Sequence, residues 1–239
     1  FIEKPSTLKS KDLSELIKIS RKKKIILMSG YIYIYNTYIQ NIKKILLSKK
    51  LGNIKYMYFE RSNLGPIRND TSCLYDLASH DVSTALYLLK KKPKVSYVKT
   101  FDFLKKSLFD ISSVGLDFKN TKVEIRSSWL NPEKIRKIII IGDKKMLQFD
   151  EMDPDKKIKI YNKYASYPDI KNFKKNFFTP KANIYLGKTY SPKINFVSPM
   201  KQELSHFFYC IKKKKKPITS GDYGLKVLRL LEDIEKKIN

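Results

Sequence analysis

Hydrophobic residues recur along this chain with two different periods. Positions spaced by three and four, which are typical of amphipathic helices, run through five segments: residues 6–24, 36–52, 75–89, 200–212 and 223–238. Strand-like runs occupy residues 25–36 and 53–62, and further short runs follow one another closely from 97 to 164. This order predicts an α/β part that leads into an α+β part, with an open, mostly antiparallel or mixed sheet flanked by helices.

Some features of these segments can be predicted more closely. Ser6 or Ser10 can cap the first helix, because a serine hydroxyl can accept a hydrogen bond from a free backbone N–H. The strand-like run 25–36 carries tyrosines that alternate as on one face of a strand, at Tyr31, Tyr33 and Tyr35. Residues 165–199 hold four prolines and no clear period, which predicts a long loop. The helix 200–212 is expected to bury three side chains: Leu204, Phe207 and Phe208.

The composition is that of a folded protein, with 42% hydrophobic residues in a chain of 239. No apolar run approaches the ~20 residues that a bilayer span needs, and no signal peptide is recognised. A cytoplasmic location without membrane contact is therefore expected. Cys73 and Cys210 stand far apart, and we expect them to be buried, reduced thiols rather than a disulfide or a metal pair.

The net charge of +27 first suggests a nucleic acid or an anionic surface as a partner. However, 44 of the 50 basic residues are lysines, and they are spread along the whole chain. Recognition of bases and phosphates favours arginine, whose guanidinium can donate two parallel hydrogen bonds. Lysine, isoleucine, asparagine and tyrosine also share A/T-rich codons, so compositional drift can produce this charge. A nucleic-acid partner is not favoured, and an anionic substrate stays open.

The two histidines differ in their surroundings. His206 lies among packing residues of a helix, which indicates a structural role. His80 follows Asp76 by four residues, a spacing that places both side chains on one face of a helix. A carboxylate beside an imidazole favours the protonated ring and can orient it for acid–base catalysis. An ion pair that only stabilises the helix stays equally open.

Lys4 follows the short apolar segment Phe1–Ile2, as a residue at the carboxyl end of a buried strand would. In open α/β sheets, ligands bind beyond the carboxyl ends of the strands. A lysine in that position can meet a cofactor or a substrate hydroxyl. Pro5 would limit how the turn moves.

Two of the six arginines, Arg61 and Arg68, lie in or beside the loop that precedes the predicted helix carrying His80. Arginines near an acid–base pair suggest an anionic substrate group, such as a carboxylate or a phosphate. Ordinary surface pairing with Glu60 or Asp70 is the alternative. The eight glycines form no GxGxxG and no phosphate-binding loop, so the residues alone carry no nucleotide-binding fingerprint.

Several motifs, taken together and in this order, resemble the Gfo/Idh/MocA oxidoreductases, and most closely those that act on nucleotide-linked sugars. They are EKP at 3–5, YN at 35–36, ERSNLGPIR at 60–68, DLASHD at 76–81, the stretch 128–154 and the closing helices from 198. The resemblance implies a Rossmann domain that binds NAD or NADP, followed by a substrate-binding domain with an open sheet. It also implies a sugar or nucleotide-sugar substrate and a homo-oligomer formed through the sheet.

The resemblance also implies roles for individual residues. Glu3, Lys4 and Pro5 would lie at the nicotinamide end of the cofactor, and Lys4 would polarise the substrate oxygen. His80 would remove the hydroxyl proton as hydride leaves the neighbouring carbon, and Asp76 would complete the catalytic set. Three residues transfer more loosely, as substrate-binding or positioning groups: Asn36, Arg61 and Arg68. No metal site is expected.

In that family, the glycine fingerprint and the first Rossmann strands would precede Glu3. The resemblance therefore implies that residues 1–30 are the end of a dinucleotide-binding domain and that residues 31–239 are the substrate-binding and oligomerisation domain. The last helix, 223–238, would pack back on the first part. An NAD(P)-dependent sugar dehydrogenase fragment is the leading hypothesis. An inactive remnant that keeps sugar binding or oligomer contacts, and a basic nucleic-acid-binding protein, are the alternatives.

Overall fold

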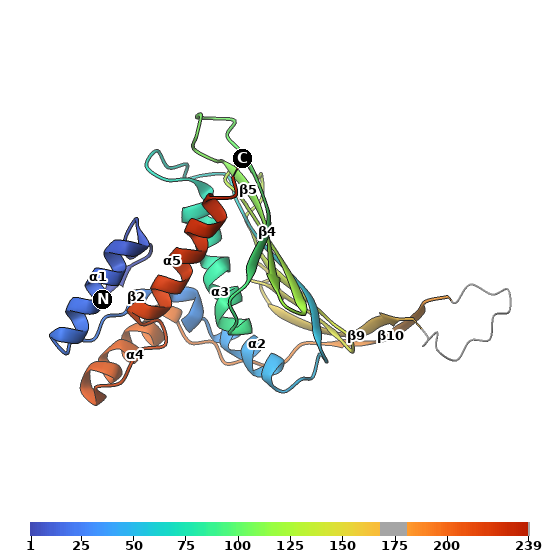
Figure 1. The fold of residues 1–239 in the computed structure, drawn as a ribbon. Coiled ribbons are helices and arrows are strands. Elements are labelled where there is room, and N and C mark those ends of the chain that lie inside the picture. The colour runs from blue at the N-terminus through green and yellow to red at the C-terminus, as the bar shows by residue number, and fades with distance from the viewer. Residues whose placement is uncertain (168–180, 239) are drawn as a thin grey trace.

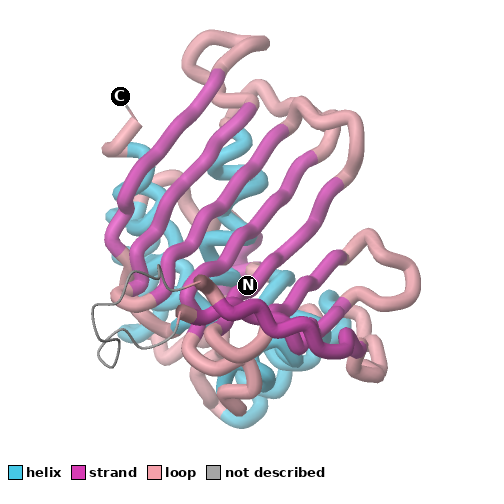
Figure 2. Tube along the Cα trace, turned by 90° about the vertical axis from the view of Figure 1, so that its right-hand side faces the viewer, coloured by secondary structure: helices cyan, strands magenta, loops and turns pink. Residues whose placement is uncertain are grey.

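The computed structural model describes residues 1–167 and 181–238. Within them, one large mixed sheet carries helices on one face, and its other face is uncovered (Figures 1 and 2). The strands run in the order β10-β9-β8-β7-β3-β6-β5-β4. Their bounds are β3 Ile54–Ser62, β4 Lys94–Phe101, β5 Ile111–Phe118, β6 Thr121–Ser128, β7 Ile135–Gly142, β8 Met146–Asp150, β9 Ile158–Ser166 and β10 Asn183–Tyr190.

Strand β3 comes first of these strands in the sequence but lies in the interior of the sheet, between β7 and β6. It pairs in parallel with β6 and antiparallel with β7, so the sheet is mixed although every other pair in it is antiparallel. Alternate residues, such as Met57 and Phe59, are fully buried beneath the helices, as the twofold period of a strand requires. The predicted open mixed sheet with flanking helices is confirmed.

Five α-helices of the described chain complete the fold. They are α1 Ser10–Lys22, α2 Thr37–Leu47, α3 Ser79–Leu89, α4 Pro199–Lys213 and α5 Gly221–Glu235. Helices α2, α3 and α5 lie over the sheet, and α1 packs against the outer side of α5 (Figure 1), where Leu13, Ile17 and Leu228 form a small apolar cluster. None of the described helices is long and apolar enough to cross a membrane.

The start of α1 differs from the prediction. Ser10 is the first residue of the helix, the residue before it is Lys9, and no side chain caps the end in the usual way. The carboxylate of Glu232 on α5 instead accepts hydrogen bonds from the Ser10 backbone N–H at 2.6 Å and from its hydroxyl at 2.7 Å. An acid far away in the sequence therefore supplies the hydrogen-bond acceptor for the start of α1. The sequence around Ser10 alone could not have predicted this contact.

The predicted strand 25–36 is wrong over most of its length. Only Ser29–Gly30, β2, is a strand, pairing in parallel with Ile2–Glu3, β1, and Ile32–Tyr35 is a 3-10 helix. Two tyrosines turn into the core: Tyr31 packs edge-on against Tyr223, and the hydroxyl of Tyr35 bonds that of Thr219 at 3.0 Å. These tertiary contacts override the β preference of the local sequence.

Two predictions near the end of the chain also need correction. The expected loop 165–199 contains the edge strand β10. Its side chains, such as Ile184 and Leu186, are mostly exposed, so the sequence shows no alternation of buried and exposed positions. Residues 168–180 of the expected loop lie outside the described residues. On α4, Leu204 and Phe208 are largely exposed rather than buried. Phe207 does pack against the core.

The thiols and His206 are placed as predicted. Cys73 and Cys210 are both buried and free. The Nε2 atom of His206 accepts a hydrogen bond from the backbone N–H of Ile218 at 3.0 Å, and its ring packs against Tyr35. His206 therefore joins α4 to the segment before α5, which is a structural role.

Glu203 is a buried carboxylate on α4 whose Oε1 has no hydrogen-bond partner among the described residues. Burial, and then the nearby Glu3, raise its pKa to about 7. The Glu203 carboxyl therefore binds its proton more tightly in the folded chain than in the unfolded chain. The stability that this protonation contributes is fully present below the pKa of an unfolded glutamate and is lost as pH rises through the folded pKa.

We expect Glu203→Gln to raise the free energy of unfolding at pH 8 by roughly 2 kcal/mol and to change it little at pH 5. Urea unfolding at the two pH values measures this difference. An equal effect at both values would show that the Glu203 carboxyl does not titrate abnormally.

Candidate active site

Strand pairing places Lys4 at a strand end, beside the start of α3. Because β1 pairs with β2, Lys4 directly follows the carboxyl end of β1. Its Nζ donates to the carbonyl oxygen of Asp76 at 2.7 Å and lies 3.4 Å from the carboxylate Oδ1. The indole N–H of Trp129 donates to the other carboxylate oxygen at 3.3 Å. Asp76 thus holds Lys4 in place, and an ammonium with three donors keeps one for a ligand.

The side chain of Lys4 is 16% exposed, so it is sheltered but reachable. Burial lowers its pKa, and the charge of Asp76 opposes that effect. The neighbouring residues of the turn behave differently. Glu3 is exposed, and its carboxylate packs closely over Gly30, while Pro5 is half-buried.

His80 presents a neutral imidazole near Lys4. Its ring packs against Tyr33 with centroids 5.5 Å apart, and its Nδ1 is buried without a hydrogen-bond partner among the described residues. Burial lowers the pKa of His80 well below its usual value, and the positive charges of Arg61, Lys4 and Arg136 lower it further. At neutral pH this ring is therefore a proton acceptor with an unused nitrogen.

The expected pairing of Asp76 with His80 is not formed. No hydrogen bond joins the two residues in the described chain, and the Asp76 carboxylate is committed to Lys4 and Trp129. The reason lies in the backbone, because Leu74–Ala78 is a π-helical turn that runs directly into α3. A π turn contains more residues than an α turn, so positions four apart no longer stack. The predicted raised proton affinity of His80 is wrong.

Arg61 forms a buried ion pair with Asp81. Its guanidinium donates to both carboxylate oxygens, at 2.9 and 2.8 Å, and the two residues are only 4% and 2% exposed. The guanidinium also lies over the ring of Tyr33, 4.1 Å from its centroid. Arg61 therefore fixes Tyr33 and the first turn of α3, and two of its five N–H donors are occupied by Asp81.

The other two predicted substrate residues also have protein partners. Arg68 lies in the exposed loop and donates to both carboxylate oxygens of Asp70, at 2.9 and 2.7 Å, which matches the surface-pair alternative. Asn36 caps α2 by accepting from the backbone N–H of Tyr38 at 2.8 Å. Its amide nitrogen also lies 3.4 Å from Glu151, so Asn36 joins the helix start to the site.

The sequence analysis did not single out the residues that join these groups. The hydroxyl of Tyr33 donates to Glu151, and burial raises the pKa of Tyr33 to about 12, so that it stays protonated. Arg136 donates to the carbonyl oxygen of Ser62 at 2.9 Å and to the side chain of Asn63. The one sequence signal for Tyr33 was its place between two core tyrosines, which pointed to a strand rather than to this site.

The described residues fit one end of a nicotinamide cofactor. The spare donor of Lys4 and the neutral imidazole of His80 are polar groups of the kind that meet a ribose or substrate hydroxyl. Glu3, Lys4 and Pro5 stand at the strand end where such a cofactor would approach. They could hold its nicotinamide end only, because the chain contains no GxGxxG for the pyrophosphate.

Comparisons with known proteins agree with this fold. Among solved structures, the chain is similar to UDP-N-acetylglucosamine 3-dehydrogenase from Acidithiobacillus ferrooxidans, at 18% identity over 99% of this chain and 69% of that one, with a TM-score of 0.77. It is also similar to aldose-aldose oxidoreductase from Caulobacter crescentus, at 17% identity over 98% and 68%, with a TM-score of 0.78.

A third similar structure is the WlbA dehydrogenase from Bordetella pertussis, solved in complex with NADH and UDP-GlcNAcA. Its identity to this chain is 17%, over 98% of this chain and 67% of that one, and the TM-score is 0.72. No curated protein sequence matches this chain.

The family comparison covers the centre of the molecule. Residues 39–148, from α2 to strand β8, match the model of the GFO/IDH/MocA C-terminal domain. These residues include β3, α3 and therefore His80. The resemblance found in the motifs is confirmed over this part of the chain, since residues 39–148 match that family's C-terminal domain and the similar solved structures share the fold.

Proposed function

We propose that this chain carries the substrate-binding domain and the proton-transfer groups of an NAD(P)-dependent dehydrogenase that acts on a sugar or nucleotide sugar. The observation that carries the proposal is a buried, neutral His80 imidazole close enough to Lys4 for that charge to lower its pKa, in a chain whose residues 39–148 match the GFO/IDH/MocA C-terminal domain. Oxidation of an alcohol needs a proton acceptor and a cation near the oxygen. Similarity to two enzymes of nucleotide sugars supports the substrate class.

The residues of the site would divide the work as follows. His80 accepts the proton of the substrate hydroxyl, because burial and three nearby cations keep the ring neutral. Lys4 donates a hydrogen bond to the same oxygen as negative charge develops on it, and Asp76 holds Lys4 in position. NAD(P), when bound, accepts the hydride from the carbon.

A second group of residues around Tyr33 would hold the base, His80, in position. The Arg61–Asp81 ion pair fixes the first turn of α3, which carries His80. The ring of Tyr33 lies against both Arg61 and His80, so it fills the space between the ion pair and the base. Glu151 accepts a hydrogen bond from the Tyr33 hydroxyl, and the Asn36 amide in turn lies 3.4 Å from Glu151. These residues act through His80 and are positioning groups.

Turnover assays test the proposal. The purified full-length gene product that contains this chain is incubated with NAD or NADP and a panel of UDP-sugars and free aldoses, while absorbance at 340 nm reports the reduced nicotinamide. Binding of the same sugars is measured by calorimetry. Turnover of a sugar or a nucleotide sugar supports the proposal. Sugar binding without turnover supports the inactive remnant instead. The absence of both sugar binding and turnover contradicts both hypotheses.

The uncovered face of the sheet (Figure 2) is the surface that we propose for contacts between copies of the chain. Half-exposed apolar and aromatic side chains project from its central strands, including Tyr56, Tyr58, Ile139 and Ile141. Burying such a face is favourable because it removes apolar area from water. Light scattering after size exclusion is expected to give a mass of two or more chains, and a monomer at micromolar concentration would contradict this surface.

A further inference from the structure

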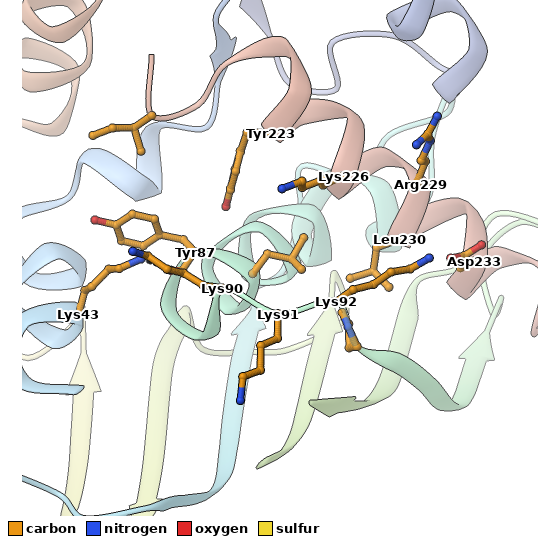
Figure 3. Close-up of a pocket in the computed structure, with 13 residues that line it drawn as sticks. Lys43, Tyr87, Lys90, Lys91, Lys92, Tyr223, Lys226, Arg229, Leu230 and Asp233 are labelled. Carbon is orange, nitrogen blue, oxygen red and sulfur yellow. Dashed lines mark hydrogen bonds between the residues drawn. The ribbon is translucent and has the colours of Figure 1, made fainter. Parts of the chain in front are cut away.

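A cavity of about 690 Å³ lies among α2, α3 and α5 (Figure 3). None of the residues that line it belongs to the candidate active site. Cationic side chains dominate its polar lining, against a single carboxylate, Asp233. The cations are Lys43, Lys90, Lys91, Lys92, Lys226 and Arg229.

These cations come from three separate elements. Lys90 to Lys92 follow the end of α3, where the partial negative charge of a helix terminus favours cations. That effect does not account for Lys226 and Arg229, which lie in the middle of α5, or for Lys43 within α2. In Figure 3 the amino groups of Lys43 and Lys90 lie beside Tyr87, and Lys226 extends towards Tyr223 from the opposite wall. Lys43, Lys90 and Lys226 therefore place positive charge from three parts of the fold around one concavity.

Lys43 shows how crowded this positive charge is. It is only 8% exposed, its ammonium donates to the carbonyl oxygen of Tyr87, and it lies 3.6 Å from the centroid of the Tyr87 ring. Burial, and then the charge of Lys90, lower its pKa to about 8. Asp233 is the one carboxylate of the lining, and it lies 4.0 Å from Lys236, a residue that does not line the cavity. A bound anion would relieve the repulsion among these amino groups.

The remaining lining is apolar. It consists of Leu86, Pro93, Ile218 and Leu230, together with the rings of Tyr87 and Tyr223. The volume lies within the roughly 300–1,000 Å³ that is typical of ligand sites, which combine apolar walls with a few polar groups. A small inorganic anion would leave these walls in contact with water, whereas an anion with an apolar or aromatic body would cover them.

We propose that this cavity binds an organic phosphate, with its phosphate oxygens on Lys90 and Lys226 and its body against Leu86, Leu230 and Tyr223. Several ammonium groups arranged around one space suit a phosphate, which can accept from each of them. A nucleotide and an alkyl phosphate share this chemistry and differ in the body that they offer to the apolar walls.

Calorimetry on the full chain tests the proposal without any cofactor or turnover, so its outcome is independent of the proposed dehydrogenase activity. The probes are ADP, decyl phosphate and inorganic pyrophosphate. The variant Lys90→Gln/Lys226→Gln removes two cations from the cavity. The control Lys11→Gln/Lys50→Gln removes two from exposed positions elsewhere, so both variants have the same net charge.

At least one organic phosphate is expected to bind more tightly than pyrophosphate. The cavity variant should weaken it at least about tenfold, because each lost charge-assisted hydrogen bond is worth about that much, while the control variant should retain nearly all affinity. ADP binding assigns an aromatic body, and decyl phosphate binding assigns an alkyl one. Equal losses in the two variants, pyrophosphate binding as tight as that of both organic probes, or no binding of any probe would overturn the proposal.

Discussion

Replacing Asp81 with alanine is expected to lower the free energy of unfolding by about 3–5 kcal/mol, because it leaves the Arg61 charge buried without its partner. Arg61 is 4% exposed and has both carboxylate oxygens of Asp81 as acceptors, so water cannot readily replace them. Urea unfolding, followed by the fluorescence of Trp129, measures the change; Trp129 is the single tryptophan of the chain and is 1% exposed.

The chain offers a matched control for this experiment. Arg68 and Asp70 form a pair with the same two-bond geometry, but both side chains are exposed. Asp70→Ala should therefore leave the unfolding free energy nearly unchanged. The double variant Arg61→Met/Asp81→Leu should recover much of the lost stability, since neither buried charge then remains. If Asp81→Ala were as mild as Asp70→Ala, burial would not be what makes the first pair important.

Replacing Lys4 with methionine is expected to reduce kcat by about 10²–10³-fold, the usual effect of losing one donor to a developing oxyanion. Methionine retains much of the length of the side chain, so the contacts along the turn persist while the ammonium that bonds Asp76 is lost. Steady-state kinetics on the best substrate of the panel measures the change. The unfolding free energy, measured in parallel, separates loss of catalysis from loss of fold.

Lys18→Met is the control for Lys4→Met. It removes the same charge from an exposed position on α1, and its kcat should match that of the original chain. A normal kcat in Lys4→Met would remove Lys4 from the catalytic residues and leave it only the structural bond to Asp76.

The parts of this fold that could be predicted from the sequence are those that local physics determines. Asn36 marks the start of α2 because an amide side chain can cap a helix, and the β-branched and aromatic residues of 53–62 marked β3. Lys4 was predicted at a strand end, which is where the structure places it. Its bond to Asp76 connects residues 72 positions apart, and no local pattern could have shown it.

The remaining features depend on contacts between distant segments. The spacing of Asp76 and His80 suggested a pair only on the assumption of an α-helix, and the π turn at Leu74–Ala78 separates them. The sequence alone did not show which acid would pair with Arg61. The structure brings β3 next to α3, and Arg61 therefore pairs with Asp81. Strand β10 has one neighbour and mostly exposed side chains, so it lacks the alternation by which strands are recognised.

The central claim is that His80 accepts the substrate proton, and hydride transfer in His80→Gln tests it most directly. Stopped-flow absorbance at 340 nm follows a single turnover, with sugar affinity measured separately by calorimetry. The account predicts a rate about 10²–10⁴-fold below that of the original chain, as is usual on loss of a general base, with sugar binding largely retained. A His80→Gln chain that transfers hydride at the original rate would contradict it.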